Sequence, residues 1–300
     1  SFDEILKTEN FKSACENLYG EFDENQVGRY QSLLDLHKAE TGFDAEYFYS
    51  SPGRIEIIGN HTDHNAGKVL CAAISVDTLG AVSKRDDGII IVKSKGYPAI
   101  KVDINEIGFD VKELGSSTAI IKGILDYYLH AGKKVGGFNA YTVSSVPKGS
   151  GVSSSSAFEL LIAEILNDLY NDGTLDPVFK AKASQYAESA FFGKPCGLMD
   201  QSAISLGGVN MIDFRSFEQP YIERAKWAFS DLDVYVIATG GDHCDLTADY
   251  AAIPAEMKSV ASALGGKLLR DISPEIFYEK EKSLVGKVKE RALLRAEHFY

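Results

Sequence analysis

Four consecutive serines, residues 153–156, open an apolar stretch with helical spacing directly after a glycine-rich loop. The whole segment, VPKGSGVSSSSAFELLIAEIL, spans residues 146–166. The first turn of a helix leaves backbone N–H groups without partners and carries partial positive charge. Glycines let a ligand approach the backbone closely, and serine hydroxyls add donors without bulk. One serine would be explained as an ordinary N-cap, but four are not, so the segment predicts an anion-binding loop suited to phosphates.

The spacing of the glycines and serines limits which known phosphate-binding motif this loop can be. The chain contains no GxxxxGK[ST] segment, which excludes a P-loop. Gly149, Gly151 and Ser154 follow the spacing of a dinucleotide-binding fingerprint, and Asp168 lies at roughly the distance where that motif has its acidic residue. Serine replaces the third glycine, however, where close packing of helix on strand leaves no room for a side chain. A dinucleotide site therefore stays as the alternative.

Two carboxylates further along the chain are candidates for proton transfer. Asp200 follows an apolar, Gly/Pro-broken loop in the segment FFGKPCGLMDQ. It either caps a helix that begins near Gln201 or places a carboxylate in a cleft as a base. Glu188 lies 12 residues earlier on a preceding helical stretch and can face the same cleft. Taken alone, a helical glutamate is more often solvated.

The segment IIGNHTDHN, residues 57–65, concentrates polar side chains after an apolar strand. His61 and His64 flank Asp63, but a zinc site needs further ligands at a suitable spacing. The remaining histidines, His37, His130, His243 and His298, do not supply one. Arg54 lies just before the same strand, so both its ends carry hydrogen-bonding groups. That arrangement suits a polyhydroxylated ligand, and a polar surface turn is the alternative.

The elements that must position these residues follow from hydrophobic periodicity. The first ~45 residues have helical spacing, and residues 45–59 predict a strand, a Pro-Gly turn and a second strand. Residues 69–83 and 89–103 predict strands joined by a hairpin-type turn, KRDDG. Further strands are expected at 138–147, 209–214 and 232–239, and helices at 118–131, 153–170, 177–192, 246–264 and 281–300.

Composition limits the possible partners. The net charge is −12, which argues against sequence-independent binding to nucleic acid or to an anionic membrane. The four cysteines have no paired spacing, and no segment resembles a leader or a membrane helix, so we expect a cytoplasmic protein with reduced thiols. The chain starts at Ser1 without methionine and stops inside a helical pattern. We therefore expect it to be part of a longer protein.

Three segments together resemble one family. SPGRIEIIGNHTDHNAGKVL is similar to the sugar-binding signature of galactokinases, VPKGSGVSSSSAF to their ATP-binding motif, and GKPCGLMDQ to their catalytic-aspartate segment. Weaker matches extend the resemblance from about residue 28 through DHCDLTADY, ALGGKLLRDIS and RALLRAEH. Galactokinases belong to the GHMP kinase superfamily. The resemblance thus implies an α+β chain with a ribosomal-protein-S5-like α/β domain, placed at 1–205, and a ferredoxin-like α+β domain, of which 206–300 would be a part. The family's third, glycine-rich motif is absent.

The resemblance also implies site residues, position by position. Asp200 corresponds to the catalytic aspartate and Arg54 to the catalytic arginine. The substrate-binding residues fall on Asn60, His61, Asp63, Gly197 and Tyr250. The phosphate loop falls on Gly149, Gly151, Ser153, Ser154 and Ser155, and the magnesium ligands on Ser155 and Glu188.

The implied reaction is phosphoryl transfer from ATP, with Mg²⁺, to the anomeric hydroxyl of galactose. Positioning and charge stabilisation would supply most of the catalysis. An aspartate with an ordinary pKa near ~3.9 is a weak base, so Asp200 is expected to accept the proton late in a loose transition state. The expected partners are a sugar and ATP, and the expected assembly is a monomer or weak homo-oligomer.

One position departs from the family pattern. Galactokinases have G-E-H-T-D where this chain has Asn60, so a neutral amide replaces a glutamate that accepts hydrogen bonds from the sugar near C6. We expect Asn60 still to bind galactose, and a shift towards a galacturonate-type sugar is the alternative. A non-catalytic sugar and ATP sensor, a dehydrogenase, and a mevalonate- or homoserine-type kinase also stay open, although the last is less compatible with the HTD cluster.

Overall fold

The computed structural model describes residues 2–228, 231–232, 234–237 and 247–300. Its strands are β1 (Tyr47–Ile58), β2 (Lys68–Arg85), β3 (Ile89–Ser94), β4 (Ile100–Asp103), β5 (Gly137–Ser144), β6 (Val209–Asp213) and β7 (Tyr221–Ala225). Its α-helices are α1 (Phe2–Ile5), α2 (Glu9–Tyr19), α3 (Glu24–Thr41), α4 (Ser117–His130), α5 (Ser154–Asn171), α6 (Pro177–Tyr186), α7 (Met199–Leu206), α8 (Thr247–Ala263), α9 (Pro274–Leu284) and α10 (Glu290–Phe299). Short 3₁₀ turns η1 (Asp63–Asn65), η2 (Val111–Glu113) and η4 (Leu269–Asp271), and a π-helical turn η3 (Ala187–Phe192), complete the described elements.

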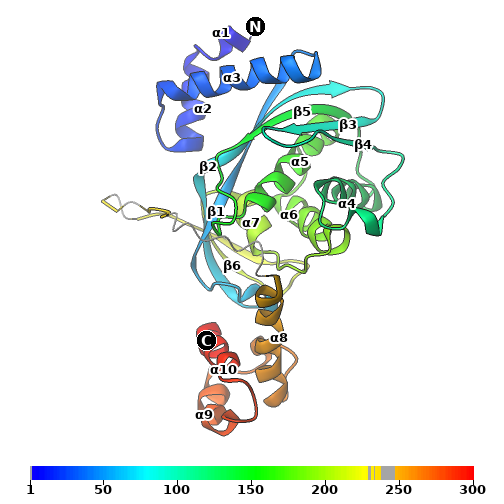
Figure 1. The fold of residues 1–300 in the computed structure, drawn as a ribbon. Helices are drawn as coiled ribbons and strands as arrows, with labels where there is room; N and C mark the ends of the chain where they lie inside the picture. The colour runs from blue at the N-terminus through cyan, green and yellow to red at the C-terminus, as the bar shows by residue number, and fades with distance from the viewer. Residues whose placement is uncertain (1, 229–230, 233, 238–246) are drawn as a thin grey trace.

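The long strand β2 organises one seven-stranded sheet (Figure 1). It pairs along its length with β1, while its other edge pairs first with β6, over residues 68–72, and then with β5, over residues 78–85. Strands β3 and β4 continue the sheet beyond β5, and β7 continues it beyond β6. All pairs are antiparallel except β3 with β5. Strand β2 thus joins the two halves of the sheet, because it pairs with β1, β5 and β6.

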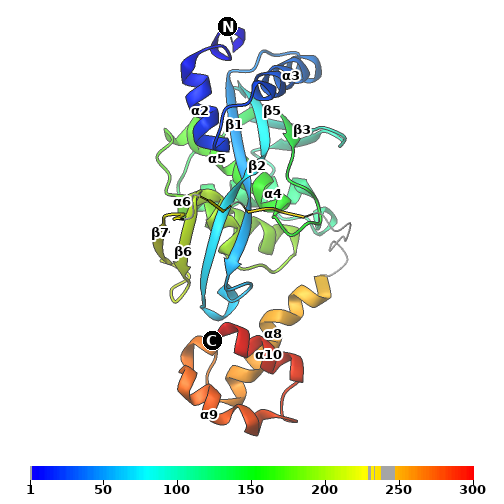
Figure 2. The same ribbon diagram turned by 90° about the vertical axis from the view of Figure 1, so that its left-hand side faces the viewer.

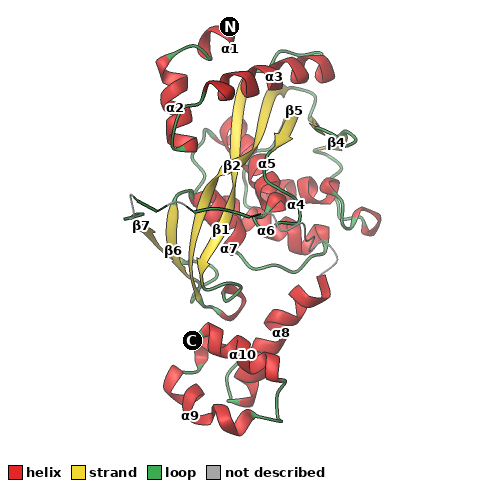
Figure 3. Cartoon of the chain, turned by 60° about the vertical axis from the view of Figure 1, so that its left-hand side comes forward, coloured by secondary structure: helices red, strands yellow, loops and turns green. Residues whose placement is uncertain are grey.

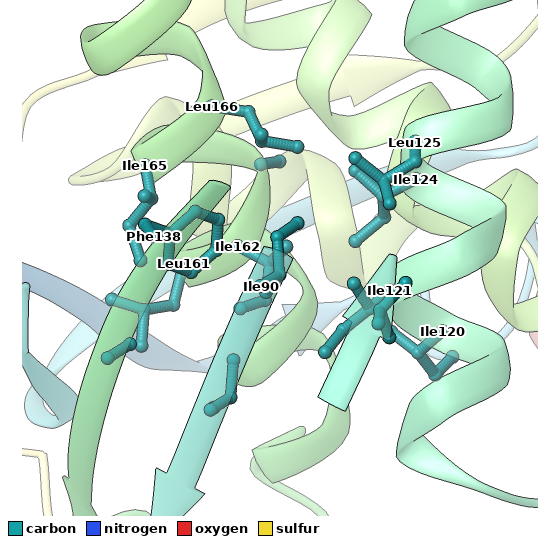
Figure 4. Close-up of a cluster of buried hydrophobic side chains, with 14 of the residues drawn as sticks. Ile90, Ile120, Ile121, Ile124, Leu125, Phe138, Leu161, Ile162, Ile165 and Leu166 are labelled. Atoms are coloured by element: carbon teal, nitrogen blue, oxygen red, sulfur yellow. The ribbon is translucent and has the colours of Figure 1, made fainter. Parts of the chain in front are cut away.

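Helices α4, α5, α6 and α7 cover one face of this sheet (Figure 1). Their apolar side chains interlock with alternate residues of the strands, because successive strand residues point to opposite faces. Figure 4 shows Ile121 and Ile124 of α4 and Leu161 of α5 gathered over Ile90 and Phe138. All five are fully buried. This core fixes the axis of α5, and therefore the position of the serine-rich loop at its start.

The opposite face of the sheet is covered at one end by α2 and α3 (Figure 2). Both helices begin at residues whose side chains cap them, Thr8 and Asp23. A buried carboxylate, Asp77 of β2, joins these helices to the sheet. It accepts hydrogen bonds from Tyr19 Oη (2.9 Å) and Ser50 Oγ (2.5 Å) and forms an ion pair with Arg29 of α3.

The segment α8–α10 forms a small helical layer beyond the tip of the β1–β2 hairpin (Figures 2 and 3). It has its own apolar core, which includes Met257, Phe277 and Leu293. The buried Asn65 joins it to the hairpin. Its Nδ2 donates to Met257 Sδ (3.3 Å), and its Oδ1 accepts from Leu269 N (3.2 Å). A third link is the ion pair between Arg270 and Asp213 at 2.7 Å.

The helices expected at 118–131 and 153–170 are confirmed within one residue at each end, and the helix expected at 246–264 is confirmed from residue 247, the first described residue of that stretch, to Ala263. The expected strand–turn–strand at 45–59 is wrong, because one strand continues through Pro52 and Gly53 with a register shift. A side chain at Gly53 would lie 2.9 Å from Val152 O, so glycine lets the phosphate loop approach the strand. The hairpin expected at KRDDG is also wrong, because β5 lies between β2 and β3.

Two further expectations at the C-terminal end are corrected. The helix expected at 281–300 is interrupted between Leu284 and Glu290, where Gly286 has φ 79°. The strand expected at 232–239 is not formed by residues 232 and 234–237, and the rest of that stretch lies outside the described residues.

β6 and β7 lie beyond the domain boundary expected at residue 205 and pair into the first sheet. Among the described helices, none has the length and apolarity needed to cross a membrane.

Replacing Asp77 by asparagine is expected to lower the free energy of unfolding. Breaking a fully buried ion pair costs about 3–5 kcal/mol, and the 25% exposure of the Arg29 side chain reduces this to about 2 kcal/mol. Urea unfolding followed by circular dichroism measures the difference. Asp86→Asn, at an exposed turn position, is the matched control and should change stability by less than about 0.5 kcal/mol. Equal stabilities for the two variants would contradict the anchoring role of Asp77.

Candidate active site

Arg54 and Asp200 form a buried, bidentate ion pair between β1 and α7. Arg54 Nε donates to Asp200 Oδ1 at 2.9 Å, and Arg54 Nη2 lies 2.7 Å from Asp200 Oδ2. Arg54 is only 5% exposed. Asp200 does not cap α7, because the N-cap residue is Leu198 and its side chain forms no capping bond. The carboxylate points towards the arginine, which agrees with the second interpretation of Asp200, a carboxylate placed in a cleft.

The environment of Asp200 keeps it ionised. Burial alone would raise the pKa of Asp200, but the charge of Arg54 and the hydrogen bond from Ser153 outweigh burial and lower it. For Arg54, burial lowers the pKa, but the charge of Asp200 raises it overall. A carboxylate with a lowered pKa is a poor base in the ground state. It is suited to orienting a hydroxyl and to accepting its proton once that proton has become acidic.

The serine-rich loop contacts this ion pair directly. Ser153 Oγ donates to Asp200 Oδ2, and Arg54 Nη1 donates to the carbonyl of Gly151. Ser153 is the N-cap residue of α5, yet its side chain forms no capping bond, and its backbone is left-handed at φ 60°. Gly149 and Gly151 also have positive φ, 66° and 77°. The first amides of α5 are therefore not capped by a side chain, as an anion-binding helix start requires.

The dinucleotide alternative does not fit this geometry. Asp168 lies 14 residues beyond Ser154 on the uninterrupted helix α5, which places it roughly 21 Å along the axis. Its carboxylate accepts a hydrogen bond from Tyr49 Oη at 2.7 Å. In a dinucleotide fold the acidic residue follows a second strand and returns to the ribose. Asp168 instead joins α5 to β1.

The loop between β1 and β2 brings Asp63 against the segment that precedes Asp200. The side chain of Asp63 is 5% exposed and accepts hydrogen bonds from His64 N (3.0 Å) and Met199 N (3.1 Å). A Cβ atom at Gly197 would lie 1.8 Å from Asp63 Oδ2, so only glycine permits this approach. Two segments that the sequence separates by more than 130 residues thus meet at one carboxylate.

His61, in the loop between β1 and β2, faces Tyr250 of α8. Their rings meet edge to face with centroids 5.4 Å apart. Together with Asp249, Ile253 and Arg295 they line a cavity of about 240 Å³. Burial lowers the pKa of His61, so its imidazole is neutral at neutral pH. A neutral imidazole can both donate and accept a hydrogen bond, which suits a hydroxyl-rich ligand.

Asn60 lies at the exposed edge of the same loop. Its backbone carbonyl accepts a hydrogen bond from His298 Nε2 of α10 at 2.9 Å. Together with the contacts of Asn65, this bond fixes the loop to the helical layer α8–α10.

A buried network of acidic side chains lies beneath the phosphate loop. Gln201 Nε2 donates to both Glu159 Oε2 (3.2 Å) and Glu188 Oε2 (2.9 Å), and Lys194 Nζ lies 2.9 Å from Glu188 Oε1. Burial raises the pKa of Glu159 well above its usual value, and the charge of Glu188 adds to this effect. Burial and the like charge thus both favour the neutral form of Glu159, while Glu188 lies against an ammonium group.

Ser155 and Glu188 are chemically suited to hold Mg²⁺. Hydroxyl and carboxylate oxygens are hard donors, and protein sites for Mg²⁺ use one or two carboxylates together with substrate phosphates. Ser155 is exposed at the start of α5, and Glu188 already binds one cationic group, the ammonium of Lys194. The Lys194 side chain is 41% exposed and can withdraw into solvent. No group of three or more His, Cys, Asp or Glu side chains suited to a metal occurs within the described residues.

Four residues of this site were not predicted from the sequence: Glu56, Glu159, Lys194 and Gln201. Two of them carry a detectable signal. Glu56 lies two residues after Arg54 on one strand, so both side chains point to the same face. Glu159 lies one helical turn after Ser155. Lys194 and Gln201 show no such spacing, because long-range packing brings them to the network.

Two family models match the chain. The galactokinase galactose-binding signature matches residues 35–84, and the N-terminal domain of GHMP kinases matches residues 118–208. Among curated relatives, a galactokinase of Clostridium tetani is 40% identical over 194 residues, which cover 63% of this chain and 47% of that protein. A galactokinase of Streptomyces coelicolor is 33% identical over 234 residues, which cover 77% of this chain and 60% of that protein. The chain thus spans about half of the length of these relatives.

Solved structures agree with the fold. The crystal structure of Lactococcus lactis galactokinase complexed with galactose superposes with a TM-score of 0.71 at 24% identity, covering 89% of this chain and 70% of that one. The mevalonate kinase of Methanococcus jannaschii superposes with a TM-score of 0.53 at 19% identity, covering 81% and 79%. These likenesses confirm the expected α+β GHMP kinase fold. With its matched signatures and relatives, the chain belongs to the galactokinase family of the GHMP kinase superfamily.

Proposed function

We propose that the protein containing this chain transfers the γ-phosphoryl group of ATP to the anomeric hydroxyl of galactose, giving galactose 1-phosphate. The observation that carries this proposal is the ion pair of Arg54 and Asp200, bonded to the phosphate loop through Ser153 and Gly151. It puts a carboxylate for the acceptor hydroxyl beside the binding place of the donor phosphates. The galactose-binding signature and the relatives named galactokinase support galactose as acceptor.

The phosphate loop would hold the donor. Gly149, Gly151 and Ser153–Ser155 present backbone amides and hydroxyls at the positive end of α5, where phosphate charge is stabilised. Because Ser153 donates to Asp200 and not to its own helix, it connects donor and acceptor parts of the site.

Asp200 would orient the anomeric hydroxyl and accept its proton late, since its lowered pKa makes it a weak base before the phosphoryl group begins to transfer. Arg54 would hold the carboxylate in place and offset negative charge on the transferring group. Asp63, His61, Tyr250, Gly197 and Asn60 would form the sugar pocket around the loop between β1 and β2.

Ser155 and Glu188 would hold Mg²⁺, which when bound neutralises the charge of the β- and γ-phosphates. Gln201 would orient Glu188 through its amide, which also donates to Glu159. The further expectations belong to the same proposal: the domains expected at 1–205 and 206–300, with β6 and β7 added to the first, a cytoplasmic location, and a monomer or weak homo-oligomer.

The first test follows ADP release by the full-length protein with ATP and Mg²⁺. Galactose, galacturonate, glucose and N-acetylgalactosamine serve as acceptors. Turnover with galactose is expected, and Asp200→Asn should reduce kcat by about 10²–10⁴-fold, because it removes the proton acceptor while keeping the shape of the side chain. The control Asp86→Asn should retain wild-type turnover.

Two outcomes would contradict this proposal. Binding of galactose and ATP without turnover would identify a sensor. Tight binding of a nicotinamide cofactor without ATP consumption would favour a dehydrogenase.

A second test addresses the cation. Glu188→Gln is expected to raise the Mg²⁺ concentration for half-maximal rate about tenfold or more, because the neutral amide loses the charge that attracts the ion. Lys194→Met removes the competing ammonium and should not raise that concentration. Titration of the initial rate with Mg²⁺ at saturating ATP measures both variants. An unchanged Mg²⁺ requirement in Glu188→Gln would exclude Glu188 as a ligand.

A further inference from the structure

Glu56 is a carboxyl group at the base of the sugar-signature loop that none of the roles above uses. It lies on β1 two residues after Arg54, and strand alternation points both side chains to the same face. It is half-buried, and the backbone N–H of His61 donates to its Oε1 at 3.4 Å. Among the described residues, this is the one hydrogen bond that the carboxyl group accepts. A carboxylate has about four acceptor positions, so hydrogen bonds within the described residues use only a small part of its capacity.

The charges around Glu56 make the proposed sugar pocket acidic. Asp200 and Asp63 act on Glu56 as like charges and Arg54 as an opposite charge. Arg54 and Asp200 neutralise each other in their bidentate pair, so Glu56 and Asp63 are the groups that leave the pocket acidic. His61 is neutral because burial lowers its pKa. A neutral sugar can donate hydroxyl hydrogens to such oxygens, whereas an acceptor that carries a carboxylate or phosphate of its own would be repelled.

We propose that Glu56 is a specificity-determining residue of the acceptor pocket, which accepts a hydroxyl hydrogen of the neutral aldohexose and excludes acidic sugars. This inference rests on the proposed function. It also bears on the alternative suggested by Asn60. The loss of a charge at the exposed position 60 does not open the pocket to a uronate, because Glu56 supplies an acidic group beneath the same loop.

The exclusion should depend on pH. Burial raises the pKa of Glu56 to about 7, with the charges of Asp200 and Asp63 adding to this and that of Arg54 opposing it. The group that faces it from β2, Cys71, has its pKa raised by burial to about 12 and stays neutral. As pH rises through about 7, Glu56 loses its proton. Its hydrogen bond with a neutral sugar then becomes charge-assisted, while repulsion of an anionic sugar grows.

The test measures kcat and KM of the full-length protein for galactose and galacturonate at about pH 6 and about pH 8. In the wild type, the preference for galactose in kcat/KM should rise about fivefold or more between these values. In Glu56→Gln the preference should not change with pH. Its KM for galactose should be about tenfold higher with kcat nearly unchanged, because a charge-assisted ground-state contact is lost. The matched control is Glu223→Gln, an exposed strand glutamate on β7, which should behave as wild type.

A wild-type KM and a wild-type pH dependence in Glu56→Gln would overturn the inference and leave the proposed function intact. If Glu56→Gln fails to fold, the same measurements are made on Glu56→Asp. It keeps the charge but shortens the reach, so it should raise KM and retain the pH dependence. If the wild type turns over no sugar, the proposed function fails, and calorimetric binding of galactose at the two pH values then decides the inference. Galactose binding that is absent, or unaffected by Glu56→Gln, would overturn it.

Discussion

The buried ion pair of Arg54 and Asp200 constrains everything around it. Removing two charges from water is costly unless each is paired and its remaining hydrogen-bonding groups are satisfied. Arg54 meets this condition with Asp200 and the carbonyl of Gly151, and Asp200 meets it with Arg54 and Ser153. These contacts draw β1, the start of α7 and the phosphate loop to one point. The close approach at Gly53, where a side chain would meet Val152 O, follows from the same requirement.

A second constraint holds the sugar-signature loop. Asn65 is fully buried, donates a hydrogen bond to Met257 and accepts one from Leu269. Asp63 accepts hydrogen bonds from the backbone amides of His64 and Met199. The turn η1 is thus fixed to the helical layer α8–α10 through Asn65 and to the segment before Asp200 through Asp63. A loop held on both sides in this way presents its polar groups in a defined geometry, which lowers the entropic cost of binding.

The sequence predicted what depends on local order and missed what depends on long-range packing. Apolar periodicity located α4 and α5, and the glycine–serine composition located the irregular loop that opens α5. Predictions from local sequence were wrong where a distant segment lies between two consecutive elements. β5 lies between β2 and β3, so the turn KRDDG does not join them into a hairpin. The interaction of Gln201 with Glu159 and Glu188 is of the same kind, since it exists only once α5, η3 and α7 have packed.

The carboxyl groups of the site differ in protonation because their surroundings differ. Asp200 is partly buried, but an arginine and a hydroxyl lower its pKa, so it remains an anion. Glu159 is fully buried and faces the like charge of Glu188, and both effects raise its pKa well above the usual value. Glu56 lies between these extremes, with a pKa raised to about 7. Identical chemical groups thus take separate tasks through burial and charge alone. Glu56, whose pKa is closest to 7, is the group that we propose to face the acceptor, where a change of protonation would alter which sugar is bound without disturbing the ion pair of Arg54 and Asp200.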